Sequence, residues 1–208
     1  MAASIITVAR TLGAGGEEVG RLVAAQLGFR YVDNEIIIKA ADTAGVSPET
    51  VEKAEHRPTL IQRIIDGMAA FPAAGDGTMV TYAAMMPAPP APDYARLIER
   101  VIHDTAHEGK AVIVAHGAGI PLAGMPGLLR VLVTASPAAR MKRIEEGAGM
   151  DARAAKKAVE ESDRERAAFL KRFYSVGEEL PVHYDLTINT DALPPEQAAR
   201  VVVVAAGD

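Results

Sequence analysis

The stretch RTLGAGGEEVG, residues 10–20, carries the groups that could bind a phosphate. Gly13, Gly15 and Gly16 permit backbone conformations that other residues avoid, so several N–H groups can point at one oxyanion. The helix predicted to follow adds partial positive charge at its first turn. The chemistry indicated is therefore phosphate binding, although a glycine-rich turn between a strand and a helix also occurs in α/β proteins that bind nothing there.

The loop lacks the lysine and the hydroxyl residue that usually accompany such glycines. Arg10 could supply the positive charge through a planar, bidentate contact with phosphate, or it could pair with Glu17 or Glu18 at the surface. Acidic residues are favoured in the first turn of any helix, but beside a polyphosphate they repel it unless a cation lies between them. Glu18, together with Asp33, is therefore a candidate ligand of Mg²⁺.

The elements that must position this loop follow from the hydrophobic pattern, which predicts five buried strands separated by amphipathic or capped helices. Such alternation implies right-handed crossovers and a parallel sheet covered by helices on both faces. We predict a single three-layer α/β domain with a five-stranded parallel sheet. The predicted strands are 4–9, 29–33, 110–116, 128–136 and 184–190; the predicted helices are 17–27, 34–43, one from Pro48, 93–108, 137–147, 151–174 and one from Pro194 or Pro195.

Ligands of parallel sheets bind at the carboxyl ends of the strands. Besides the glycine-rich loop, these ends carry Asp33, His116, Ser136 and Asn189. Asp33 could instead cap the following helix, and His116 could be a strand-end histidine bonded to the backbone. The sequence places all of them at one edge of the sheet and leaves these alternatives open.

Composition limits the function classes. At 208 residues, with 49% hydrophobic and 24% charged residues, the chain fits one globular domain, and its N-terminal residues resemble neither a signal peptide nor a membrane span. The absence of cysteine excludes disulfides and thiolate metal sites and predicts a cytoplasmic location. The net charge of −5 argues against a nucleic-acid partner. Residues 140–172, with ten Lys and Arg against seven Asp and Glu, suit a local anionic ligand.

Five segments together resemble the cytidylate kinase-like family of P-loop proteins, over nearly the whole chain except about 45–92: ARTLGAGGEEVG, GFRYVDNEII, AVIVAHGAG, ESDRERAAFLKRFY and YDLTINTDAL. In an ungapped overlay on bacterial cytidylate kinases, the first glycine of the loop falls on Arg10, the P-loop lysine on Gly16 and the magnesium-binding hydroxyl on Glu18. The family's Gly-Arg pair after the third strand is replaced by residues 115–116, and the aspartate that recognises cytosine falls on Gly117. The sequence therefore indicates a degenerate P-loop and gives no support for cytosine specificity.

The resemblance implies a P-loop kinase fold over residues 1–208, with a core of about 1–44, 93–146 and 176–208, an acceptor-binding region of about 45–92 and a hinged lid of about 147–175. It implies ATP or another nucleoside triphosphate and Mg²⁺ as cofactors. The implied nucleotide contacts are Leu12, Gly13, Ala14, Gly15, Gly16, Glu17, Glu18 and Asn189; Asp33 and His116 would bind the acceptor; and Arg164, Arg166 and Arg172 would stabilise the charge of the moving phosphoryl group. Arg10 joins these arginines because of its place beside the loop and not because of the resemblance.

Apart from this resemblance, residues 160–174 are typical of a solvated helix with salt bridges. Arg164 and Arg166, two residues apart, lie on different sides of a helix, so both reach one ligand only if the segment bends or the ligand lies at its end.

The leading hypothesis is a phosphotransferase that moves the γ-phosphoryl group of a nucleoside triphosphate to a nucleoside monophosphate or a similar small acceptor. The alternatives are a non-catalytic nucleotide-binding protein and a homo-oligomeric scaffold that uses the proline-rich segment 71–92 as its contact surface.

Overall fold

The computed structural model describes residues 2–33, 35–55, 94–114 and 117–207. These residues form a five-stranded parallel sheet with the order β2-β3-β1-β4-β5. The strands are β1 (Ile5–Arg10), β2 (Arg30–Val32), β3 (Ala111–Val114), β4 (Leu128–Thr134) and β5 (Leu186–Asn189). β1 lies at the centre, where Ile5 is opposite Ala111 on one side and Leu128 on the other. Its nearly continuous apolar run suits this position, because a central parallel strand is buried on both faces.

The helices begin and end close to the predicted boundaries. They are α1 (Gly16–Leu27), α2 (Glu35–Ala44), α3 (Pro48–Glu55), α6 (Tyr94–Glu108), α7 (Pro137–Ala148), α8 (Ala152–Tyr174) and α9 (Pro195–Ala205), and a 3₁₀ turn, η1, spans Pro181–His183. The Ser136 hydroxyl caps α7 by accepting from the N–H of Ala139, and the Asp151 carboxylate caps α8 in the same way through Ala154.

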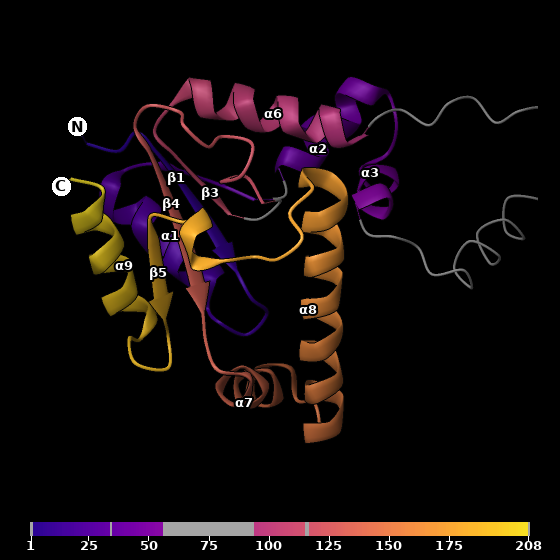
Figure 1. Cartoon of the computed structure of the whole chain (residues 1–208), viewed down its shortest axis with the longest axis vertical. Helices are drawn as coiled ribbons and strands as arrows, with labels where there is room; N and C mark the ends of the chain where they lie inside the picture. Colours follow the sequence, from indigo (N-terminus) through magenta and orange to yellow (C-terminus); the bar gives the residue numbers. More distant parts are fainter. Residues whose placement is uncertain (1, 34, 56–93, 115–116, 208) are drawn as a thin grey trace, which may run out of the picture.

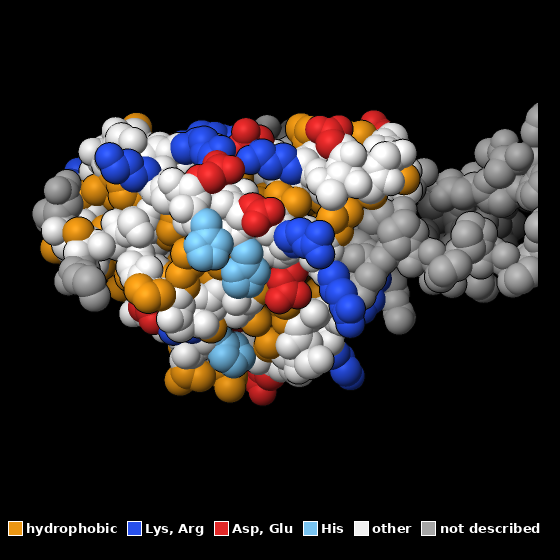
Figure 2. Space-filling view, turned by 90° about the horizontal axis from the view of Figure 1, so that it is seen from above, with side chains coloured by type: hydrophobic (Ala, Val, Ile, Leu, Met, Phe, Trp, Pro, Cys, Tyr) orange, Lys and Arg blue, Asp and Glu red, His pale blue; other side chains and the backbone are white. Residues whose placement is uncertain are grey.

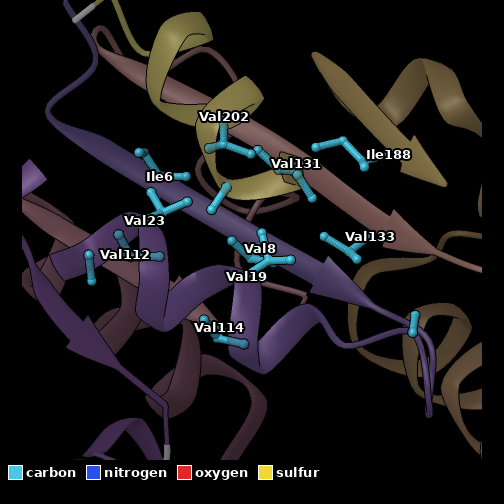
Figure 3. Close-up of a cluster of buried hydrophobic side chains, with 14 of the residues drawn as sticks. Ile6, Val8, Val19, Val23, Val112, Val114, Val131, Val133, Ile188 and Val202 are labelled. Carbon is cyan, nitrogen blue, oxygen red and sulfur yellow. The ribbon is translucent and has the colours of Figure 1, made fainter. Parts of the chain in front are cut away.

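Helices cover both faces of the sheet, which confirms the predicted three layers (Figure 1). On one face, α1 and α9 pack against valines of β1, β3 and β4 and Ile188 of β5, and Figure 3 shows Val19, Val23 and Val202 of these helices directed at the strands. On the other face, α2, α3 and α6 enclose a second buried cluster that includes Ile5 and Ile113. The two ends of the described chain meet, since the N–H of Ala3 donates to the carbonyl of Ala206.

α7 lies beyond the carboxyl ends of β1 and β4, and α8 stands beside the sheet next to α7 (Figure 1). α8 is one continuous helix of 23 residues, so the bend considered for the predicted lid is absent from it. Of the predicted acceptor-binding region, α3 is described, while residues 56–92 and His116 lie outside the described residues.

The face over α6 carries acidic, basic and histidine side chains interspersed with apolar ones (Figure 2). No helix in the described ranges is long and apolar enough to span a bilayer.

Candidate active site at the carboxyl ends of the strands

The loop between β1 and α1, residues 11–15, has the conformation that its glycines predict. Gly13 and Gly15 both adopt φ of 78°, in the left-handed region that favours glycine, and the N–H of Ala14 donates to the carbonyl of Thr11 at 3.0 Å. Gly15 is the N-cap residue of α1 and has no side chain that could accept from the first N–H groups of the helix. These donors, at the positive end of the helix, are therefore available to an anion.

The carbonyl groups of this loop accept hydrogen bonds from side chains that sequence analysis missed. Arg140 and Arg143 of α7, together with Thr190 after β5, each donate to a different loop carbonyl. The acceptors are Leu12 at 2.6 Å from Arg140 Nε, Gly13 at 3.1 Å from Arg143 Nη1, and Ala14 at 2.9 Å from Thr190 Oγ1. Because these three carbonyls are occupied, the loop backbone is fixed without the help of a P-loop lysine.

Arg10 and Gly16 are in close contact at the mouth of the loop. Gly16 is buried, and a Cβ added to it would lie 2.4 Å from the Cβ of Arg10, closer than non-bonded carbon atoms approach. The side chain of Arg10 therefore begins in the space that a lysine at position 16 would need. Arg10 and Gly16, two of the positions at which the overlay indicates departures from the family pattern, are therefore sterically dependent on each other.

Arg10 forms a salt bridge with Glu17, the alternative role that its sequence position left open. Arg10 Nε donates to Glu17 Oε1 at 2.7 Å, with the two side chains 23% and 40% exposed. A guanidinium has five N–H donors, and the two terminal nitrogens of Arg10 bond to no described residue. The pair therefore orients the guanidinium and leaves most of its donors for another acceptor.

The two candidate metal ligands are Glu18 and Asp33. Glu18 is exposed in the first turn of α1, and Asp33, at the end of β2, accepts a hydrogen bond of 3.3 Å from the hydroxyl of Tyr31. Within the described residues, no three His, Asp or Glu side chains gather closely enough to hold a metal ion by themselves. The carboxylate oxygens of Glu18 have the right chemistry for Mg²⁺, which keeps most of its waters and needs only one or two protein ligands when it is bound to a nucleotide.

Asn189, predicted to contact the nucleotide, ends β5 and is exposed. Its side-chain oxygen accepts from the N–H of Asp191, whose carboxylate in turn accepts from the N–H of Ser136. Hydrogen bonding by Ser136, mainly by its side chain and also by its backbone N–H, lowers the pKa of Asp191 below its ordinary value. These bonds join the loops that follow β4 and β5.

The predicted lid arginines do not converge. Arg164 is exposed on α8, and the guanidinium of Arg172 lies 4.6 Å from the ring centroid of Phe173. Arg166 instead forms a bidentate ion pair with Glu179, at 2.7 and 2.5 Å, in which both side chains are only 17% exposed. Because α8 is unbent, the two-residue spacing directs Arg164 and Arg166 to different sides, as expected for a helix.

The pair of Arg166 and Glu179 is completed by Tyr184, whose hydroxyl donates to the same carboxylate. Burial alone would raise the pKa of Glu179, but the hydrogen bonds and charge of Arg166 outweigh it and lower that pKa below its ordinary value. Burial and the neighbouring carboxylate raise the pKa of the Tyr184 hydroxyl. At neutral pH the cluster is therefore ionic and hydrogen-bonded, and it fastens α8 to the segment that leads into β5.

Comparison with known proteins agrees with this geometry. The model of the cytidylate kinase-like family matches residues 5–192. Among solved structures, the chain is similar to an uncharacterized protein from Eubacterium ventriosum (16% identity, 98% of each chain covered, TM-score 0.67). It is also similar to shikimate kinase from Bacteroides thetaiotaomicron (12% identity, 100% of each chain, TM-score 0.56) and to shikimate kinase from Acinetobacter baumannii in complex with shikimate (11% identity, 98% of this chain and 92% of that chain, TM-score 0.51).

These structural similarities concern the fold, which is that of the P-loop kinases. No protein with a curated description matches the chain. The family match extends from the first residue of β1 to beyond the end of β5 and includes the loop, α7 and α8. The chain therefore belongs to the cytidylate kinase-like family.

Proposed function

We propose that the protein is a phosphotransferase that moves the γ-phosphoryl group of ATP or another nucleoside triphosphate to a nucleoside monophosphate or a similar small acceptor. Membership in the cytidylate kinase-like family supports a nucleotide kinase. The observation that carries the proposal is the close contact of Arg10 with Gly16, because it keeps a cation beside the loop although the lysine is absent.

In the proposed site, the N–H groups of Gly13, Gly15 and Gly16 bind the β- and γ-phosphates at the start of α1. Arg10, oriented by Glu17, supplies the bidentate positive charge that phosphoryl transfer requires in its transition state. Glu18 would hold Mg²⁺, which neutralises charge on the phosphates when it is bound. Arg164, exposed on α8, would approach the phosphates from the lid side.

The structure favours other roles for two of the predicted arginines. Arg166 is engaged by Glu179 and Tyr184, so we assign it to holding α8 in place. Arg172 stacks on Phe173, and we propose that it acts only after a movement of the end of α8. Asp33 remains our candidate for the acceptor side, since it lies at the end of β2.

The acceptor is a small phosphorylated or hydroxylated molecule in this proposal. Cytosine recognition has no support, because Gly117 stands at the position of the cytosine-reading aspartate. Two of the structural neighbours are shikimate kinases, so the same fold also serves acceptors that are not nucleotides. A nucleoside monophosphate stays the first acceptor to test, because it is the one that the family relation implies.

The test is ADP formation from ATP and Mg²⁺ with a panel of nucleoside monophosphates and hydroxylated metabolites, alongside calorimetric titration with ATP. We expect turnover with at least one acceptor and a loss of about 10²–10³ in kcat for Arg10→Gln, the effect of removing one transition-state donor. Arg200→Gln, which removes an exposed arginine of α9, is the control, and its turnover should be unchanged. Binding of ATP without transfer to any acceptor would instead identify a non-catalytic nucleotide-binding protein.

A further inference from the structure

Arg140 is the most deeply buried charged side chain in the described part of the chain, at 4% exposure, and the mechanism proposed above does not use it. It connects three elements. From α7 it donates Nε to the carbonyl of Leu12 in the phosphate loop at 2.6 Å, and it donates Nη1 and Nη2 to the carboxylate of Asp163 in α8 at 3.0 and 2.6 Å. One guanidinium therefore joins the loop directly to the predicted lid helix.

The burial of the Arg140 guanidinium explains why its ion pair with Asp163 matters. A guanidinium keeps its proton at every relevant pH, so a buried one must have a counter-charge or lose much of its solvation without compensation. Asp163 supplies that charge and is itself 44% exposed, at the edge of the contact. If α8 moves away, Asp163 leaves with it and Arg140 loses its counter-charge, while its Nε still faces the carbonyl of Leu12. The docked position of α8 and the position of Arg140 against the loop are therefore stabilised together.

Arg143 provides an internal comparison. It lies three residues further along the same helix face and also holds the loop, through the carbonyl of Gly13, but its other bonds go to Thr190 after β5. Arg143 therefore holds the loop through bonds that do not depend on the position of α8. Of the two arginines of α7, Arg140 alone has a bond to α8 among the described residues.

We propose that Asp163 is a positioning residue for phosphate binding. By holding Arg140 against the carbonyl of Leu12, it makes the conformation of the phosphate loop depend on the docking of α8. This proposal deepens the proposed function and rests on it for the identity of the ligand, whereas the coupling between α8 and the loop holds for the protein without ligand. Because such coupling is reciprocal, occupation of the loop by a triphosphate stabilises the docked position of α8.

The test compares Asp163→Asn with Glu161→Gln. The control removes a carboxylate of the same helix, whose exposed pair with Lys157 at 3.7 Å contacts no part of the loop. Without nucleotide, we expect Asp163→Asn to speed hydrogen exchange of the Ala14 amide, which is bonded within the loop, by at least about tenfold, and Glu161→Gln to leave it unchanged. With ATP and Mg²⁺, we expect Asp163→Asn to weaken binding by about tenfold or more, while the helix content is retained.

A second variant decides the question if the unpaired arginine prevents folding. Arg140→Met with Asp163→Leu replaces the ion pair by apolar side chains, which buried pairs generally tolerate, but it also releases the carbonyl of Leu12. The same rise in Ala14 exchange is expected. Wild-type exchange at Ala14 in either folded variant would overturn the proposal. If the wild-type protein bound no triphosphate at all, the proposed function would fail, while the exchange experiment would still decide whether α8 and the loop are coupled.

Discussion

The close contact between Arg10 and Gly16 predicts that neither position tolerates a change that the other has not accommodated. A Cβ at position 16 would lie 2.4 Å from Arg10 Cβ, 3.1 Å from Arg10 Cγ and 3.4 Å from Val133 Cβ. Carbon atoms in contact are normally about 3.5–4.0 Å apart. The overlap with Arg10 Cβ cannot be relieved by a change of rotamer, because both Cβ atoms are attached rigidly to backbone, one in the central strand and the other in the first turn of α1.

We therefore expect Gly16→Ala to lower the free energy of unfolding by about 1–3 kcal/mol, the usual cost of overpacking, and Gly16→Lys to do the same while weakening ATP binding. Arg10→Gly should lose about tenfold or more in ATP affinity, because it removes the guanidinium. The double variant Arg10→Gly/Gly16→Lys removes the overlap and returns the cation from position 16. It should be more stable than Gly16→Lys and should bind ATP within about tenfold of the wild type, which makes the effects of the two changes non-additive.

The assay is urea unfolding for stability and calorimetric titration with ATP and Mg²⁺ for binding, on all four corners of the cycle. Gly147→Ala serves as a control, because nothing lies within 4 Å of where its Cβ would be, and it should be neutral or stabilising in α7. A Gly16→Ala variant as stable as the wild type, or additive effects in the cycle, would refute the reciprocal relation between the two positions.

Three further predictions follow from the site and its surroundings. Glu179→Gln should cost about 3 kcal/mol at neutral pH, because it leaves the guanidinium of Arg166 without its carboxylate. Since the pKa of Glu179 is lowered on folding from an ordinary 4.5, its contribution is present above that value and is lost as the pH falls through the lowered pKa. Urea unfolding should therefore show the wild-type advantage shrinking as the pH falls below 4.5, and an advantage that does not change with pH in acid would contradict this. Arg164→Ala should reduce kcat with little change in the Kd of ATP. An unchanged kcat in steady-state assays would show that Arg164 has no part in catalysis. Glu18→Ala should weaken the dependence of ATP affinity on Mg²⁺ in paired titrations with and without the metal, and an unchanged dependence would remove Glu18 from the site.

Local sequence signals accounted for the secondary structure and the fold class. Apolar runs predicted the five strands, and boundary residues such as Ser136 and Gly28 marked the ends of helices within a residue or two, because each of these signals acts over one turn or one strand. The order of the strands had no such local signal. It depends on which apolar faces pack together, and only the structure placed β1 at the centre between β3 and β4.

The candidate site divides in the same way. The sequence by itself determined that a glycine-rich loop precedes a helix, that its lysine is missing and that Arg10 stands nearby. The tertiary structure decided that Arg10 fills the space of a side chain at Gly16, and that the loop carbonyls are held by arginines of α7 more than a hundred positions further along the chain. It also decided that Arg166 pairs with Glu179, while Arg164 on the same helix is exposed. The physical reason is that the sequence specifies the charge and size of each side chain, whereas the packing of distant elements determines its partner. That packing brings together residues with no periodic relation along the chain.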